Sequence, residues 1–153
     1  GYDRLIASTT RLNTPGPELA AIDGVHAITD VTGFGLAGHT LEMARGAGLV
    51  AAVDWSRVPL LAGARELAQG GCVTGASGRN WSGYGAEVAL PDGFDAVDRA
   101  LLTDPQTSGG LLVSCSPAAL PKVLEVFHGS GFEAAQAIGE MLPTSGAARL
   151  VVR

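Results

Sequence analysis

The sequence predicts an α/β (α+β) fold in which helices pack on a mixed sheet. Its 153 residues fit a single domain, since domains most often contain roughly 100–150 residues. Short apolar runs typical of strands alternate along the chain with stretches whose apolar residues recur at helical spacing. The hydrophobic fraction is 46% and the charged fraction 16%, which favours a packed core over disorder.

The first third of the chain contains one predicted strand between helical segments. Residues 1–17 show no clear period, and residues 18–22 form a short helical turn after two prolines. Residues 25–29 are a buried strand that follows an Asp-Gly turn signal. A helix is expected over 36–44, where apolar residues recur three and four positions apart, and the glycines after it end the helix.

The middle third is predicted as a strand, a helix, a long loop and a second strand. Residues 49–55 are an apolar run rich in strand-forming residues, and residues 62–68 have a helical composition that ends at a pair of glycines. Residues 72–84 are polar and rich in Gly and Ser, and we expect a loop there. Loops of that length in compact domains are usually functional or mobile. Residues 86–90 form a short strand.

The last third adds two helices and three strands. Residues 95–102 are helical in composition, and residues 111–115 form an apolar strand. Pro117 opens a helix that continues to about residue 128, because proline is favoured at the first helical position. Two final strands are expected at residues 134–138 and 150–152. The order of the strands in the sheet does not follow from these patterns.

Charge and composition exclude several classes of partner. The formal net charge is −5, Lys and Arg do not cluster, and aromatic residues make up only 5% of the chain, so we expect no nucleic-acid partner. No apolar run approaches the roughly 20 residues that span a bilayer, and no signal peptide is visible. We therefore expect no membrane partner and a cytoplasmic protein. Cys72 and Cys115 are expected to be buried, reduced thiols.

A glycine-rich segment between the first strand and the next helix has the composition of a phosphate-binding loop. Residues 30–35 (DVTGFG) combine Asp30, Thr32 and glycines Gly33 and Gly35. Glycines let backbone N–H groups approach an anion, and a helix N-terminus carries a partial positive charge. Asp30 is a hard oxygen ligand suited to Mg²⁺. The alternative interpretation is an aspartate that caps the loop and glycines that allow close packing.

A second polar segment precedes the strand at 111–115. Residues 104–110 (DPQTSGG) bring one carboxylate, one amide, two hydroxyls and two glycines together, more polar groups than a plain turn needs. A rigid turn set by Pro105 and the glycine pair is the alternative interpretation. Neither segment matches a P-loop, because the only lysine, Lys122, lies in a predicted helix away from both. Spacing alone does not tell whether the two segments meet.

These two segments resemble the hallmark motifs of the selenide, water dikinase (selenophosphate synthetase) family. The motif residues are 30–36 (DVTGFGL) with Gly38 and His39, and 102–112 (LTDPQTSGGLL). Residues 75–80 (GASGRN) also fit the family. The resemblance runs from about residue 12 to the end of the chain. It implies an enzyme that converts ATP, selenide and water into selenophosphate, phosphate and AMP with Mg²⁺.

The resemblance also implies a fold, a domain and site residues. The related superfamily, which includes aminoimidazole ribonucleotide synthetase, has two α/β domains, and this chain resembles the C-terminal one, a three-layer sandwich with partial likeness to a ferredoxin-like fold. Asp30 matches a metal ligand, and Thr32, Gly33 and Gly35 match the loop that faces the polyphosphate. Further phosphate- or nucleotide-binding residues are expected in the second segment, and two candidates in the middle loop. They are Asp104, Gln106, Thr107, Ser108, Gly109 and Gly110, with Arg79 and Asn80 as the two candidates.

The chain departs from the family by lacking its N-terminal segment. The catalytic Cys or selenocysteine and its partner Lys lie in that segment, so we expect no catalytic residue in this chain and little activity from it alone. Cys72 follows two glycines but has no lysine near it, so a buried or loop cysteine is favoured over a reactive thiol. The chain begins with Gly1 rather than Met, and we expect it to be a piece of a longer protein.

Partners follow from the same resemblance. The domain should pair with its own N-terminal domain and contribute to an ATP/Mg²⁺ cleft. The whole enzyme is expected to be a homodimer and the isolated domain a monomer. The alternative hypothesis is a stand-alone nucleotide- or anion-binding or assembly module without turnover, favoured by the absence of a plausible nucleophile with its base. Another member of the superfamily is a third possibility, against which the DPQTSGG segment argues.

Overall fold

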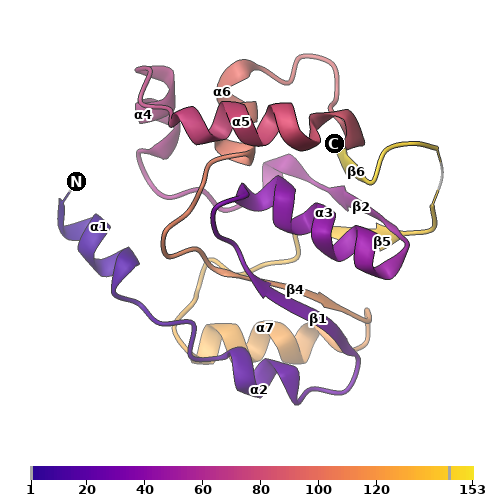
Figure 1. The fold of residues 1–153 in the computed structure, drawn as a ribbon. Helices are drawn as coiled ribbons and strands as arrows, with labels where there is room; N and C mark the ends of the chain where they lie inside the picture. The colour runs from indigo at the N-terminus through magenta and orange to yellow at the C-terminus, as the bar shows by residue number, and fades with distance from the viewer. Residues whose placement is uncertain (1, 145) are drawn as a thin grey trace.

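The computed structural model describes residues 2–144 and 146–153, and it confirms an α/β fold with a mixed sheet (Figure 1). Its strands are β1 (Val25–Asp30), β2 (Val50–Val53), β3 (Val88–Ala89), β4 (Leu111–Cys115), β5 (Gly139–Leu142) and β6 (Leu150–Val152). Its α-helices are α1 (Tyr2–Thr9), α2 (Gly16–Ala20), α3 (Gly35–Ala47), α4 (Ala64–Gln69), α5 (Gly75–Tyr84), α6 (Ala96–Leu102) and α7 (Leu120–Gly129). Two 3₁₀ turns lie at Trp55–Arg57 and Gly85–Glu87.

Every helix in the described part of the chain is too short or too polar to span a bilayer.

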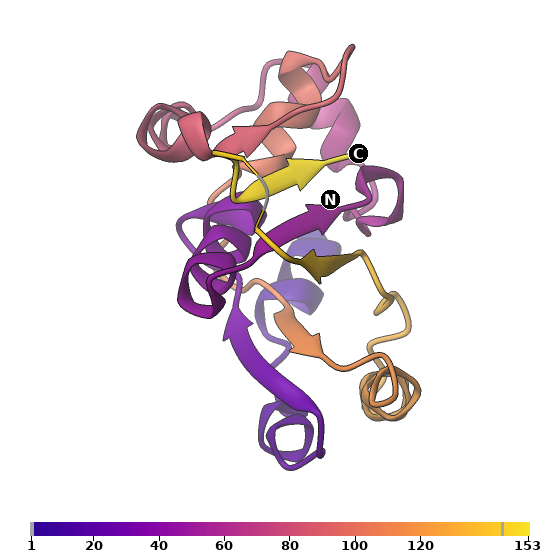
Figure 2. The same ribbon diagram turned by 90° about the vertical axis from the view of Figure 1, so that its right-hand side faces the viewer.

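The strands form two groups. The larger sheet has the order β3-β6-β2-β5, in which β6 runs parallel to both β3 and β2 while β5 is antiparallel to β2. β1 and β4 form a separate antiparallel pair, with Asp30 opposite Leu111. Figure 2 shows this pair below the larger sheet. The end of β1 and the beginning of β4 therefore lie at the same end of the pair.

Each strand group has its own apolar core. The larger core joins α3 to the larger sheet, and Leu41 of α3 and Leu150 of β6 are fully buried in it. The smaller core lies between the β1–β4 pair and helices α2 and α7, around Leu19 and Phe127 (Figure 1). α3 ends at Gly48, which adopts the left-handed conformation that favours glycine at helix ends. A third layer and a likeness to a ferredoxin-like fold stay predictions.

The prediction of a loop over residues 72–84 is wrong, because most of that segment is helix α5. The Thr74 side chain caps the helix by accepting a hydrogen bond from the Ser77 N–H at 3.2 Å. Three glycines in α5 give it a low intrinsic helix propensity. Packing supports it, since Ser77 is buried and the Arg99 guanidinium of α6 lies 5.3 Å from the centre of the Trp81 ring. Tertiary contacts therefore override a local sequence that favours a loop.

Three smaller predictions are also corrected. The N-terminal stretch without a clear period contains helix α1, and the strand expected at 134–138 is instead β5, which begins at residue 139. Cys72 and Cys115 are free thiols as expected, but Cys72 is exposed and Cys115 is only partly buried. Burial raises the pKa of the Cys115 thiol. Neither thiol is therefore a fully buried core residue.

Candidate functional site

The two polar segments meet because β1 and β4 pair in an antiparallel manner. The segment at 30–35 leaves the end of β1, and the segment at 104–110 leads into β4. Beyond the strands, the Val31 N–H donates to the Gly110 carbonyl at 2.9 Å. The Gln106 N–H donates to the Thr32 carbonyl at 3.0 Å. We call the 30–35 segment the first loop and the 104–110 segment the second loop.

Two glycines allow the loops to approach each other. A β-carbon on Gly109 would overlap the carbonyl oxygen of Val31. Gly35 has a φ of +70°, and a β-carbon there would lie 2.7 Å from the Thr103 carbonyl carbon. Both positions therefore exclude side chains for reasons of packing and backbone conformation. Gly33 and Gly110 differ, because a β-carbon at either one would face open space.

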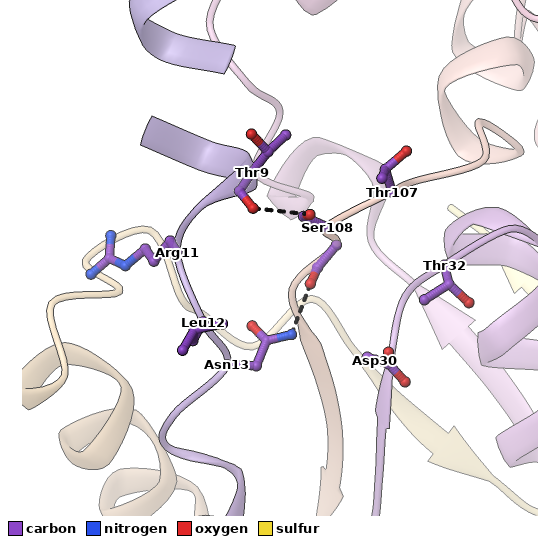
Figure 3. A pocket seen from close by; sticks show the side chains of 9 residues that line it. Thr9, Arg11, Leu12, Asn13, Asp30, Thr32, Thr107 and Ser108 are labelled. Atoms are coloured by element: carbon purple, nitrogen blue, oxygen red, sulfur yellow. Dashed lines mark hydrogen bonds between the residues drawn. The ribbon is translucent and has the colours of Figure 1, made fainter. Parts of the chain in front are cut away.

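A shallow cavity of about 200 Å³ opens between the two loops and the segment that follows α1. Figure 3 shows Asp30 and Thr32 on one side of it, residues 9–13 on the other, and Ser108 between them. Five of the residues predicted from the sequence line it, namely Asp30, Thr32, Thr107, Ser108 and Gly109. Four lining residues were not predicted: Thr9, Arg11, Leu12 and Asn13.

Residues 9–13, the side of the cavity that was not predicted, are held in place by contacts with distant parts of the chain. The Asn13 amide donates to the Gly109 carbonyl at 2.9 Å, and the Ser108 hydroxyl donates to the Thr9 carbonyl at 3.2 Å. The Arg11 guanidinium lies 4.0 Å from the centre of the Phe132 ring. All of these partners lie nearly 100 or more residues away, so no local pattern could have identified them.

Helix α5 also contacts the first loop and the residue that precedes the second loop. The Asn80 amide nitrogen donates to the Gly33 carbonyl at 2.9 Å and to the Thr103 carbonyl at 3.0 Å. The Ser77 and Thr103 hydroxyls lie 2.6 Å apart in the interior. The Tyr84 hydroxyl donates to the Phe34 carbonyl at 2.6 Å. Arg79 is exposed and does not line the cavity, although it had been considered together with Asn80.

His39 supports the first loop from α3. It is buried, and its Nε2 lies 3.0 Å from the Thr32 hydroxyl. Its Nδ1 lies 2.8 Å from a carboxylate oxygen of Glu42, without the alignment of a hydrogen bond. His39 is therefore a packed side chain. Its partner Thr32 faces the cavity, so His39 fixes a side chain of the site.

The remaining predicted residues lie near the cavity but do not line it. Asp104 is half-buried, and burial raises the pKa of its carboxyl group. Gln106 connects the loops through its backbone, as described above. Gly33, Gly35 and Gly110 belong to the loop backbones around the opening. Asp30 is exposed, and it is the one carboxylate that lines the cavity among the described residues.

This arrangement suits an anion accompanied by a cation. The first loop presents backbone N–H groups, and among the described residues no backbone acceptor takes a hydrogen bond from the N–H of Gly33 or Phe34. Successive free N–H groups in a turn form a concave anion site. The carboxylate of Asp30, which belongs to the same loop, would repel an anion bound there unless a cation lay between the two. Within the described part of the chain, no group of three or more His, Cys, Asp or Glu side chains forms a complete metal site.

Comparison with known proteins identifies similar chains. The family described as AIR synthase related protein, C-terminal domain, matches residues 8–151. A selenide, water dikinase of Burkholderia pseudomallei (strain K96243) is 62% identical over 152 residues, which cover 99% of this chain and 42% of the relative. The enzyme of the same name from Burkholderia ambifaria (strain MC40-6) is 59% identical over 93% of this chain. That from Rhizobium meliloti (strain 1021) is 49% identical over 99% of this chain. The chain spans about 40% of the length of these relatives.

Proposed function

Because this chain belongs to the AIR synthase related family as a C-terminal domain, we propose that it forms one wall of the ATP cleft of a selenophosphate synthetase. The complete enzyme would convert ATP, selenide and water into selenophosphate, phosphate and AMP. The observation that carries this proposal is the convergence of the two loops on one cavity. The high identity to proteins named selenide, water dikinase supports the choice of reaction.

The cavity residues are suited to provide some of the ligands of a magnesium ion. Mg²⁺ prefers oxygen ligands and usually takes only one or two protein carboxylates, with phosphate oxygens and water completing its shell. The exposed Asp30 carboxylate is such a ligand, beside the Thr32 hydroxyl. We propose that Asp30 holds Mg²⁺ bound to the ATP phosphates. The metal would neutralise phosphate charge, and further ligands would come from outside this chain.

The residues of the loops would bind and orient the phosphates. The N–H groups of Gly33 and Phe34 face no backbone acceptor among the described residues, so they are free to donate to phosphate oxygens. The hydroxyl of Thr107 can add a further hydrogen bond, while that of Ser108 already donates within the protein. Arg11 lines the cavity, but its guanidinium lies over the Phe132 ring and donates to the Ser130 carbonyl at 3.1 Å, so it is not free to bind phosphate. In phosphoryl transfer such positioning and charge stabilisation provide most of the catalysis.

Asp104 and Gln106 would act from the second loop. Burial favours the neutral form of the Asp104 carboxyl group, so its negative charge is most stable beside a cation. Gln106 supports the first loop through its bond to Thr32. We propose that both shape the phosphate site behind the residues that line it.

We propose that the rest of the enzyme supplies the reacting groups. The relatives extend well beyond the region that matches this chain, and a second domain there would carry the catalytic Cys or selenocysteine and its Lys. A contiguous exposed apolar patch marks an interaction site, and we propose that large apolar side chains exposed on this chain contribute to the contact with that domain. They are Tyr2, Ile6, Leu12, Phe34, Leu60, Leu61, Leu67 and Val73. We further propose that the complete enzyme is a cytoplasmic homodimer and that this domain alone is a monomer.

The test uses the complete protein encoded by the reading frame that contains this chain. We expect AMP formation that depends on both selenide and Mg²⁺. Asp30→Asn should lower that rate by more than about 100-fold, since even residues behind metal ligands are worth about 10–100-fold. Asp23→Asn, at the exposed turn before β1, is the matched control and should leave the rate unchanged.

The outcomes separate the parts of the proposal. A complete protein that forms no AMP from ATP with selenide would overturn the reaction. ATP binding without turnover would instead favour a nucleotide-binding module. An Asp30→Asn variant with the normal Mg²⁺-dependent rate would overturn the metal role and leave the reaction standing.

A further inference from the structure

Asn80 lies at the junction of the two loops, and the NH₂ group of its amide makes two hydrogen bonds there. Both acceptors within reach of its Nδ2 are backbone carbonyls, one from Gly33 in the first loop and one from Thr103, the residue just before the second loop. An amide NH₂ group has two hydrogens, so each carbonyl receives one of them. Asn80 therefore has no hydrogen left to donate to a phosphate.

The bond to Gly33 fixes the direction of a peptide group. In a trans peptide the C=O and the following N–H point in opposite directions. The Gly33 carbonyl points to α5, so the Phe34 N–H points away from α5. The Thr32 carbonyl is likewise turned inward, because it accepts from the N–H groups of Gly35 and Gln106, both at 3.0 Å. Two successive N–H groups, those of Gly33 and Phe34, are thereby turned outward.

Asn80 can act in this way because α5 is itself fixed. Ser77, Asn80 and Tyr84 follow one another at spacings of three and four residues, which puts them on one face of the helix. Ser77 anchors that face to Thr103, and Tyr84 anchors it to the Phe34 carbonyl. The Asn80 amide lies between these two anchors. Asn80 and Tyr84 of the helix thus both donate to carbonyls of the first loop, those of Gly33 and Phe34.

We infer that Asn80 is a positioning residue, which orients the Gly33 and Phe34 N–H groups toward a polyphosphate. This inference rests on the proposed function, since it concerns the same phosphate site. It differs from direct binding, because Asn80 acts through the loop backbone and does not touch the ligand.

The test follows individual backbone amides by NMR in the ¹⁵N-labelled 153-residue chain. The probe is magnesium tripolyphosphate, and the signals of Gly33 and Phe34 report on the first loop. In the unaltered chain both signals should shift on titration. Asn80→Ala should weaken the affinity roughly tenfold, because hydrogen bonds to a charged group are lost when the peptide turns. Its melting temperature should fall by roughly 4–8 °C, because the Gly33 and Thr103 carbonyls each lose a hydrogen-bond donor, but the variant should stay folded.

Two further variants sharpen the test. Ser82→Ala is the matched control, because the Ser82 hydroxyl is exposed and bonds only within α5, to the Gly78 carbonyl. It should change the affinity less than twofold. Asn80→Asp keeps the shape of the side chain but presents only oxygens to the two carbonyls, and it should weaken binding at least as much as Asn80→Ala.

Each result has a distinct meaning. Shifts of Gly33 and Phe34 with equal affinity in both Asn80 variants and the unaltered chain would overturn the positioning role and leave the phosphate site standing. If neither signal moves in the unaltered chain, the phosphate site itself fails and the inference fails with it. If both Asn80 variants are unfolded by circular dichroism, the amide is a requirement of folding, and the positioning role is overturned.

Discussion

Gly109 packs against the carbonyl group of Val31 so closely that no side chain fits between them. This contact lies where the first loop leaves β1 and the second loop enters β4. The neighbouring Gly110 is different, because a β-carbon there would meet nothing within 4 Å. Two adjacent glycines of one motif thus have separate roles, one in joining the loops and one at an open position.

The first prediction separates these two glycines. Gly109→Ala should lower the free energy of unfolding by roughly 1–3 kcal/mol, because a methyl group must displace backbone atoms. Gly110→Ala should change it by less than about 0.5 kcal/mol, as at most surface sites. Urea unfolding of both variants gives the comparison. Equal stability of the two would show that the loops do not meet as described.

The second prediction concerns the glycines of the first loop. Gly35→Ala should cost roughly 2 kcal/mol or more of unfolding free energy, since alanine is strained at a φ of +70° and its methyl group would collide with the backbone of Thr103. Gly33→Ala should be nearly as stable as the unaltered chain, because its β-carbon faces open space. It should nevertheless bind magnesium tripolyphosphate more weakly, as measured by calorimetry. Unchanged binding would argue against phosphate approaching Gly33.

The third prediction tests the buried hydroxyl pair of Ser77 and Thr103. Ser77→Ala and Thr103→Val should each lower the free energy of unfolding by about 1 kcal/mol, the usual net worth of a buried hydrogen bond. The double variant should lose less than the sum of the single losses, with a coupling of about 0.5–1.5 kcal/mol. Ser82→Ala, on the exposed side of the same helix, is the control. Strict additivity would mean that the 2.6 Å contact does not contribute to stability.

The fourth prediction concerns stability in alkali. Burial raises the pKa of Tyr84 from 10.0 to about 12, so the folded protein keeps the phenol proton at pH values where the unfolded chain releases it. The contribution of this group to stability is therefore complete below pH 10 and is lost as the pH rises through about 12. Tyr84→Phe should cost about 1 kcal/mol at pH 8 but should lessen the fall in stability above pH 10.

Urea midpoints at pH 8, 10 and 11 measure this effect. Tyr2→Phe serves as the control, because the Tyr2 side chain is 76% exposed and its removal should leave the alkaline fall unchanged. If Tyr84→Phe shows the same fall as the unaltered chain, the Tyr84 phenol is not protected by the fold.

Local sequence signals were sufficient for most elements around the site. The apolar runs that became β1, β4 and β6 and the helical stripe of α3 were predicted close to their observed bounds. The two elements that were predicted wrongly, α5 and β5, both depend on contacts with distant residues. Helix α5 contains three glycines, and packing against α3 and α6 supports it, which no property of residues 75–84 reveals. A strand was expected at residues 134–138, but β5 lies at residues 139–142, where it pairs with β2.

Residue types alone were sufficient to name the candidates for phosphate and metal binding, which stay predictions. Carboxylate, hydroxyl and glycine chemistry is a property of residue type, so Asp30, Thr32 and the residues of the second loop were identifiable without a structure. That the loops converge could be learned only from the fold, because antiparallel pairing of β1 with β4 joins segments about 75 residues apart. The fold also added the wall at residues 9–13 and the Asn80 amide, whose partners lie far away in the sequence. Such contacts depend on strand pairing and packing, which short-range patterns do not encode.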